Sequence, residues 1–149
     1  MSDEPLPGLG PVRRTIRIFC DGGSRGNPGP AGIGAVVLDA TSEPPRTLAS
    51  VSETIGIATN NVAEYTALIR ALEVATEFEA TRVEVRADSQ LLIRQLEGRY
   101  RVKNAGLAPL HRRAQELLRP YPEVDLQHVR REDNVDADAL VNAALDAAG

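Results

Sequence analysis

Apolar and polar residues alternate along the first part of the chain, as they do in β-strands. From Thr15 to Asp21 an apolar side chain occupies every second position, which predicts a strand that ends at Asp21. Further strands are predicted over residues 32–38 and 47–55, with Gly- and Pro-rich stretches before and between them. Short connections between three successive strands predict an antiparallel meander.

The pattern then changes to a helical period. Apolar residues from Val62 to Ala75 recur at intervals of three and four, which predicts an amphipathic helix. The remaining pattern predicts a strand over 82–87, a short helix from Ser89, a helix over 107–119, a strand over 124–129 and a closing helix over 135–148. Strands reached through helices are added in parallel. The order βββαβααβα therefore predicts an α/β fold with a five-stranded mixed sheet, three strands antiparallel and two parallel, and helices on both faces.

The ends of these elements carry candidate caps. Asn61 and Glu64 are spaced as in a capping box, and Asn134 is placed to cap the last helix. Residues 1–13 hold Pro and Gly with little to bury, so we expect a flexible tail there and one domain over 14–149.

Composition and charge narrow the functional classes. The chain of 149 residues has 17 basic and 21 acidic residues, and its net charge of -4 argues against a uniformly basic nucleic-acid binder. A single cysteine, Cys20, allows no internal disulfide. No apolar run approaches the roughly 20 residues of a membrane span, and no signal-peptide pattern is present. We therefore expect a cytoplasmic monomer without a membrane partner.

Acidic residues stand where predicted strands end or helices begin. They are Asp21, Glu64, Asp88 and one of Asp133, Asp136 or Asp138. Such ends meet at one edge of an α/β sheet, where ligands usually bind. Carboxylates gathered there repel one another unless a divalent cation neutralises them, and oxygen ligands suit Mg²⁺ or Mn²⁺. The lone Cys and the two His have no zinc-site spacing.

Each acid also has a structural interpretation. Glu64 can be the capping-box partner, Asp21 and Asp88 can be turn formers, and Asp136 and Asp138 can complement a helix start. Helical periodicity does not choose between the last two. The Gly-rich stretch over 22–32, which predicts a turn, lacks Gly-Lys-Ser/Thr and joins two strands, which argues against a phosphate-binding P-loop.

Four motifs in register strongly resemble the type 1 ribonuclease H family from about Thr15 to Leu145. They are DGGSRGNPGPAGIGAVV, TNNVAEYTALIRAL, RADSQLLIRQLEG and DNVDADALVNAAL. The resemblance implies the ribonuclease H-like fold. It implies that the catalytic and metal-binding carboxylates are Asp21, Glu64, Asp88 and Asp138. It also implies an endonuclease that hydrolyses the RNA strand of an RNA–DNA hybrid with two Mg²⁺ ions, leaving 5′-phosphate and 3′-hydroxyl ends, with Mn²⁺ as the expected substitute.

The resemblance further implies a substrate surface of short polar groups, which suits recognition of 2′-hydroxyls in a shallow minor groove. Its candidates are Gly22, Asn27, Thr59, Asn60, Asn61, Ser89 and Gln90. Thr59 is the candidate for a DNA-strand phosphate. Asn27 can instead be a turn former, and Asn60 and Asn61 helix caps. Double-stranded RNA is a second candidate substrate.

A basic segment spans residues 94–113, where six cationic residues accompany only one acidic residue, Glu97. We hypothesise that Arg99, Arg101 and Lys103 grip backbone phosphates, with a solvated surface as the alternative. Well-known family members carry a longer Trp- and Lys-rich protrusion here. This chain resembles the compact members without it.

The stretch before the last helix reads QHVRREDNVDAD and lacks the loop His of many family members. Arg130 or Arg131 is expected to substitute, and His128 is expected to pack or hydrogen-bond within the sheet. A non-catalytic hybrid-binding module is the main alternative function, which the four carboxylates disfavour. A resolvase or transposase core is another, which the NNVAE and DSQ motifs disfavour.

Overall fold

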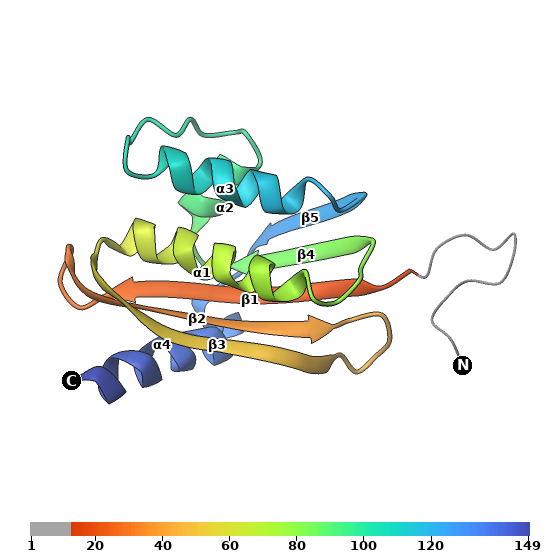
Figure 1. Ribbon diagram of the computed structural model, residues 1–149, viewed down its shortest axis with the longest axis horizontal. Helices are drawn as coiled ribbons and strands as arrows, with labels where there is room; N and C mark the ends of the chain where they lie inside the picture. Colours follow the sequence, from red (N-terminus) through yellow and green to blue (C-terminus); the bar gives the residue numbers. More distant parts are fainter. Residues whose placement is uncertain (1–12) are drawn as a thin grey trace, which may run out of the picture.

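The computed structural model describes residues 13–149, which form a five-stranded sheet with four α-helices (Figure 1). The strands are β1 (Thr15–Ser24), β2 (Gly29–Asp39), β3 (Arg46–Ala58), β4 (Arg82–Ala87) and β5 (Glu123–His128). The helices are α1 (Asn60–Ala75), α2 (Gln90–Leu96), α3 (Ala108–Leu118) and α4 (Val135–Ala148), with a 3₁₀ turn over Arg131–Asp133. The predicted order of elements is confirmed, whereas the expected tail lies outside the described residues up to residue 12.

The strands lie side by side in the order β3-β2-β1-β4-β5. β1 pairs antiparallel with β2 and parallel with β4, and β5 continues the parallel half. The mixed sheet predicted from the crossovers is therefore confirmed. β1 is the central strand, and the carboxyl ends of β1, β4 and β5 point the same way.

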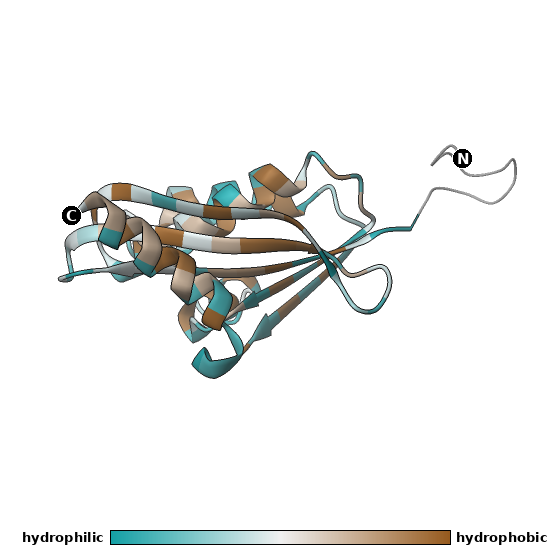
Figure 2. Ribbon diagram, turned by 90° about the horizontal axis from the view of Figure 1, so that it is seen from below, coloured by the Kyte–Doolittle hydropathy of each residue, from teal (hydrophilic) through white to brown (hydrophobic). Residues whose placement is uncertain are grey.

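Helices cover both faces of the sheet. α1 packs on β1 and β2 with α3 beside it, and α4 packs on the opposite face against β1, β2 and β3 (Figures 1 and 2). Ile16, Ile18 and Cys20 alternate along β1 into the core beneath α1, which is why the period-two pattern identified this strand. Among residues 13–149 no helix has the length and apolar character needed to cross a membrane.

The first strand is longer than its hydrophobic pattern indicated. The prediction that it ends at Asp21 is wrong, because pairing with β2 continues through Asp21↔Gly34 to Ser24↔Ala31. The turn predicted over the Gly-rich stretch is correspondingly shorter, since only residues 25–28 leave the two strands. The glycines inside the strands instead allow two helices to approach the sheet closely.

Two predicted helix caps are also corrected. Thr59, not an Asn61/Glu64 capping box, caps α1, since its Oγ1 accepts from the Val62 amide at 3.2 Å. Asn134 stands at the start of α4, but its side chain makes no cap. Its Nδ2 instead donates to the carbonyl of Cys20 at 3.0 Å, which ties the start of α4 to β1.

Candidate active site

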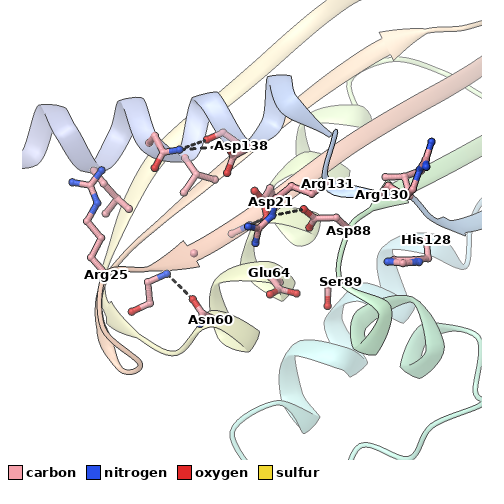
Figure 3. Close-up of a pocket in the computed structure, with 17 residues that line it drawn as sticks. Asp21, Arg25, Asn60, Glu64, Asp88, Ser89, His128, Arg130, Arg131 and Asp138 are labelled. Atoms are coloured by element: carbon pink, nitrogen blue, oxygen red, sulfur yellow. Dashed lines mark hydrogen bonds and ion pairs between the residues drawn. The ribbon is translucent and has the colours of Figure 1, made fainter. Parts of the chain in front are cut away.

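The four acids singled out by the motifs meet in one cavity of about 520 Å³ (Figure 3). Asp21 lies on β1, Glu64 in the first turns of α1, Asp88 directly after β4 and Asp138 in the first turn of α4. Asp133 and Asp136 do not line this cavity. The tertiary structure thus gathers acids from four elements that are distant in sequence.

Two glycines, Gly22 directly after Asp21 and Gly34 opposite it on β2, bring the two helical acids into place. A Cβ at Gly22 would lie 2.2 Å from the carbonyl carbon of Ala63, so only glycine lets α1 approach this closely. Glu64 is the residue after Ala63. On the other face, a Cβ at Gly34 would lie 2.3 Å from the carbonyl oxygen of Ala137, and Asp138 follows it.

Strand register places Asp88 next to Asp21. Cys20 on β1 is the parallel partner of Ala87 on β4, so Asp21 within β1 and Asp88 just past the end of β4 lie at the same level on adjacent strands. Ser89 then caps α2, with its Oγ accepting from the Leu92 amide at 3.1 Å. The turn from β4 into α2 therefore begins at the cavity, which Ser89 also lines.

The crowding of these acids disturbs their ionisation. Burial, followed by the charges of Asp88 and Asp138, raises the pKa of Asp21 to about 7, although the Gly22 amide donates to its Oδ1 at 2.9 Å. Burial also raises the pKa of Glu64, with the nearby Ser89 hydroxyl opposing and Asp88 adding to the rise. The negative charge in this cavity is thus incompletely neutralised.

The donor set fits a hard divalent cation. Glu64 Oε2 is buried and accepts no hydrogen bond. This oxygen is therefore available to a cation. Asp138 lies beside its neighbour on the same helix, Asn142, with the Asn142 Nδ2 atom 3.5 Å from Asp138 Oδ2. Among residues 13–149 no three Asp, Glu, His or Cys side chains already form a group that could hold an ion. A cation here would have to draw together carboxylates that otherwise repel one another.

Three of the predicted substrate residues line the cavity, namely Gly22, Asn60 and Ser89. Asn60 Oδ1 accepts from the Ser24 amide at 2.8 Å, and the Asn60 amide donates to Asn27 Oδ1 at 3.0 Å. These two bonds connect the turn after β1 to the start of α1. Asn27 therefore borders this region without lining the cavity itself.

The other predicted substrate residues lie outside the cavity lining. Thr59 caps α1, and Asn61 and Gln90 are exposed at the starts of α1 and α2. Arg99, Arg101 and Lys103 are exposed on the loop between α2 and α3.

Two arginines border the acids at the end of β5. Arg131 Nε lies 3.9 Å from Asp88 Oδ2, whereas Arg130 pairs with Glu132 and Asp133 of its own turn at 3.4 and 3.6 Å. Both line the cavity, but only Arg131 contacts one of the four acids (Figure 3).

The sequence pattern missed His128 as a cavity residue. It is paired with Ala87 at the end of the edge strand β5, as expected of a residue in the sheet, but its ring is exposed and lines the cavity on the side of Ser89 (Figure 3). The pattern also missed Asn142, which the four-residue spacing from Asp138 could have indicated. Arg25 was missed as well; it lines the cavity and pairs with Asp146 of α4 at 2.5 Å.

Comparison with known proteins gives one matching family and several similar relatives. A family described as reverse transcriptase-like matches residues 19–144. Ribonuclease H of Halorhodospira halophila is 39% identical over 150 residues, covering 90% of this chain and 95% of that protein. Ribonuclease HI of Halobacterium salinarum is 44% identical, covering 88% of this chain and 64% of the relative. The bifunctional protein Rv2228c of Mycobacterium tuberculosis is 47% identical, and this chain spans 36% of its length.

Solved structures match over most of the fold. The crystal structure of RNase H1 from Halobacterium salinarum aligns with a TM-score of 0.83 and 44% identity, covering 89% of this chain and 98% of that one. LC11-RNase H1, solved in complex with an RNA/DNA hybrid, aligns with a TM-score of 0.81 and 46% identity, covering 89% and 98%.

Proposed function

We propose a function from one premise: this chain belongs to the type 1 ribonuclease H family and has its fold. It hydrolyses the RNA strand of an RNA–DNA hybrid as an endonuclease, leaving 5′-phosphate and 3′-hydroxyl ends. The observation that carries this proposal is the meeting of Asp21, Glu64, Asp88 and Asp138 in one cavity. A solved relative, LC11-RNase H1, in complex with an RNA/DNA hybrid supports the choice of substrate.

The four carboxylates would hold two Mg²⁺ ions, or Mn²⁺ in their place. The unpartnered Oε2 of Glu64 and the raised pKa of Asp21 support a cation there. When bound, such ions activate the attacking water and stabilise the leaving 3′ oxygen. Asp21, on the central strand, would be one of the residues that hold them.

The protein side chains then have separate tasks around the acids. Asn60 and Ser89, with the backbone at Gly22, offer short donors and acceptors suited to the 2′-hydroxyls of the RNA strand. Asn27, Asn61 and Gln90 extend this polar surface. The hydroxyl of Thr59, while capping α1, is the candidate contact to a DNA-strand phosphate.

An arginine beside the acids, Arg131, completes the proposed active site. Arg131 contacts Asp88 at 3.9 Å and therefore offsets part of the negative charge that would repel an incoming phosphate. We assign the role of the absent loop His to Arg131 in preference to Arg130, whose guanidinium faces Glu132 and Asp133.

One assay tests the function. Labelled RNA–DNA hybrid, double-stranded RNA and double-stranded DNA are incubated with Mg²⁺ or Mn²⁺, and the products are sized. We expect hybrid cleavage, and cutting of double-stranded RNA would reveal a second substrate. Removing a residue that only supports a metal ligand lowers activity by about 10–100-fold. Asp88→Asn and Asp138→Asn remove the proposed ligands themselves, so each should lower the cleavage rate by more than that.

Asp136→Asn is the matched control for Asp138→Asn, since both acids lie in the first turn of α4 and only Asp138 lines the cavity. The control should cut like the parent. The proposal is wrong if no substrate is cut, or if Asp88→Asn cuts as well as the parent. A hybrid that is bound by the parent but never cut would identify a non-catalytic binding module instead.

A further inference from the structure

Most arginines in the described part of the chain lie beside a carboxylate, and three of the four that do not are gathered in one place. Within residues 13–149 the arginines without an ion pair are Arg13, Arg101, Arg112 and Arg119. Three of them, all but Arg13, line a single hollow of about 490 Å³. This hollow shares no lining residue with the cavity of the four acids.

The basic segment therefore has less available charge than the sequence indicates. Arg94 and Arg99 lie 3.0 and 3.7 Å from Glu97, and Arg113 lies 3.4 Å from Glu73 and 3.7 Å from Glu116. The hypothesis that Arg99 serves as a free phosphate contact is weakened by its pairing. Arg119, beyond the segment, adds a cation that the count over 94–113 missed.

Residues of α2, of the loop after it and of α3 line the hollow, and these elements lie together along the top of Figure 1. Arg112 and Arg119 are separated by seven residues on and just after α3, which puts them on the same side of the helix. Arg101 reaches the hollow from the loop. No acidic residue is among its lining residues, so three arginines line it without a counter-charge.

A hydrogen-bond network around the buried side chain of Gln95 supports this hollow. The Tyr65 hydroxyl donates to Gln95 Oε1 at 2.6 Å, and Gln95 Nε2 donates to the Arg101 carbonyl at 3.4 Å. Gln115 Nε2 donates to the Leu96 carbonyl at 3.0 Å, which ties α3 to α2. Gln95 is 5% exposed, so its bond to the Arg101 carbonyl starts from a buried side chain and holds the loop against α2.

We propose that this hollow binds backbone phosphates of a nucleic-acid strand that extends beyond the catalytic cavity. Guanidinium groups match phosphate oxygens through paired N–H donors, and an anion would relieve the repulsion among the three cations. The inference rests on the proposed nuclease function and adds a second contact site to it.

The helix α2 sets the distance between the two sites. Ser89, at the start of α2, lines the catalytic cavity, and Gln95, near its end, lines the hollow. Six residues of α-helix between them correspond to about 9 Å. That separation is roughly three nucleotides at about 3.4 Å per nucleotide of one strand. One substrate molecule can therefore occupy both sites.

The test compares a double substitution in the hollow with a single substitution of a neighbouring arginine. Arg112→Ala/Arg119→Ala removes two cations of the hollow, whereas Arg113→Ala removes a neighbouring arginine that is already paired with Glu73 and Glu116. Both are made with Asp88→Asn so that binding is measured without cleavage. The dissociation constant for a long RNA–DNA hybrid is measured from about 50 to about 200 mM salt. Over this range, affinity that comes from phosphate contacts falls steeply.

We expect the hollow variant to lower the salt slope by about 0.9 for each phosphate that is no longer neutralised, so by about 2 in all, while Arg113→Ala keeps the parent slope. With Asp88 restored, KM for the hybrid should rise in the hollow variant and kcat should stay near that of the parent. Equal melting temperatures of the two variants verify that α3 remains folded.

The failures of the two proposals are distinguishable. If the parent cuts the hybrid but the hollow variant keeps its salt slope, the second site is wrong and the nuclease proposal stands. If the parent cuts nothing, the nuclease proposal fails. Binding of a fluorescent 20-nucleotide oligothymidylate to the parent and to the hollow variant then tests the phosphate site by itself. Equal binding of that oligonucleotide to parent and hollow variant would overturn the site.

Discussion

The same sheet carries two clusters of half-buried charges that are built in opposite ways. On the face of β4 away from the core, Glu84 lies 2.7 Å from Arg17 and 3.1 Å from Arg82, and Arg86 lies 2.8 Å from Asp125. At the carboxyl end of β4, four acids line one cavity with Arg131 at 3.9 Å from Asp88. The first cluster is balanced, and the second carries surplus negative charge.

The ionisation of the two clusters follows this difference. Burial alone would raise the pKa of Glu84, but hydrogen bonds from Arg17 and Arg82 hold it below its usual value. Asp21, without such partners, has a pKa raised to about 7 by burial and by its acidic neighbours. Charge balance thus indicates a structural cluster, whereas retained imbalance indicates a site that requires a cation.

The largest effect on stability is expected in the balanced cluster. Glu84→Gln leaves Arg17, Arg82 and Arg86 without their shared carboxylate, which should lower the free energy of unfolding by about 2–3 kcal/mol. Urea denaturation measures this. Glu123→Gln, which removes an exposed partner of Arg82, is the control and should change stability by less than about 0.5 kcal/mol. If the two substitutions lowered stability equally, Glu84 would contribute no more than an exposed ion pair, and the balanced cluster would not be a stabilising one.

In the acidic cavity, replacing a carboxylate with an amide should raise stability instead of lowering it. Because the pKa of Asp21 is higher in the folded protein than its usual 3.8, its contribution to stability is fully present below that value and is lost as pH rises through about 7. Asp21→Asn should therefore stabilise the protein in chelator at pH 8 by about 1 kcal/mol, after allowance for solvent screening.

Melting temperatures measured in chelator at pH 8, 6 and 5 check this sign. The advantage of Asp21→Asn should shrink as pH falls from about 7 towards 4, because the parent then takes up a proton at Asp21. Added Mg²⁺ should stabilise the parent more than the variant. A destabilised Asp21→Asn protein at pH 8 would mean that the acids do not strain the fold.

The smallest stability effect concerns Arg131, the arginine that contacts Asp88. Arg131 is 87% exposed, so Arg131→Gln should change the free energy of unfolding by less than about 0.5 kcal/mol, as should Arg130→Gln. Cleavage of the hybrid should distinguish the two variants. Arg131→Gln should cleave about tenfold more slowly or worse, because loss of a group that contacts a metal ligand reduces activity by that amount, whereas Arg130→Gln should keep the parent rate. Equal cleavage by both variants would show that the contact with Asp88 has no role.

The sequence by itself determined the order of elements, the mixed sheet and, through four motifs, the acids to examine. These follow from local periodicity and from spacing within each motif, which depend on neighbouring residues. Even so, periodicity left Asp136 and Asp138 equivalent, and the resemblance chose between them. The close contact between Gly34 and Ala137 then shows how Asp138 reaches the cavity.

Only the tertiary structure decided which charges are matched. Arg99 and Arg101 look alike in the sequence, as do Arg112 and Arg113, yet Arg113 pairs with Glu73, forty residues away, while Arg112 faces a hollow without acids. Glu64 fits a capping box by spacing, but the approach of α1 to Gly22 places it in the cavity. Such outcomes depend on side chains far apart in the chain, because electrostatic pairing acts through space and leaves no local period to read.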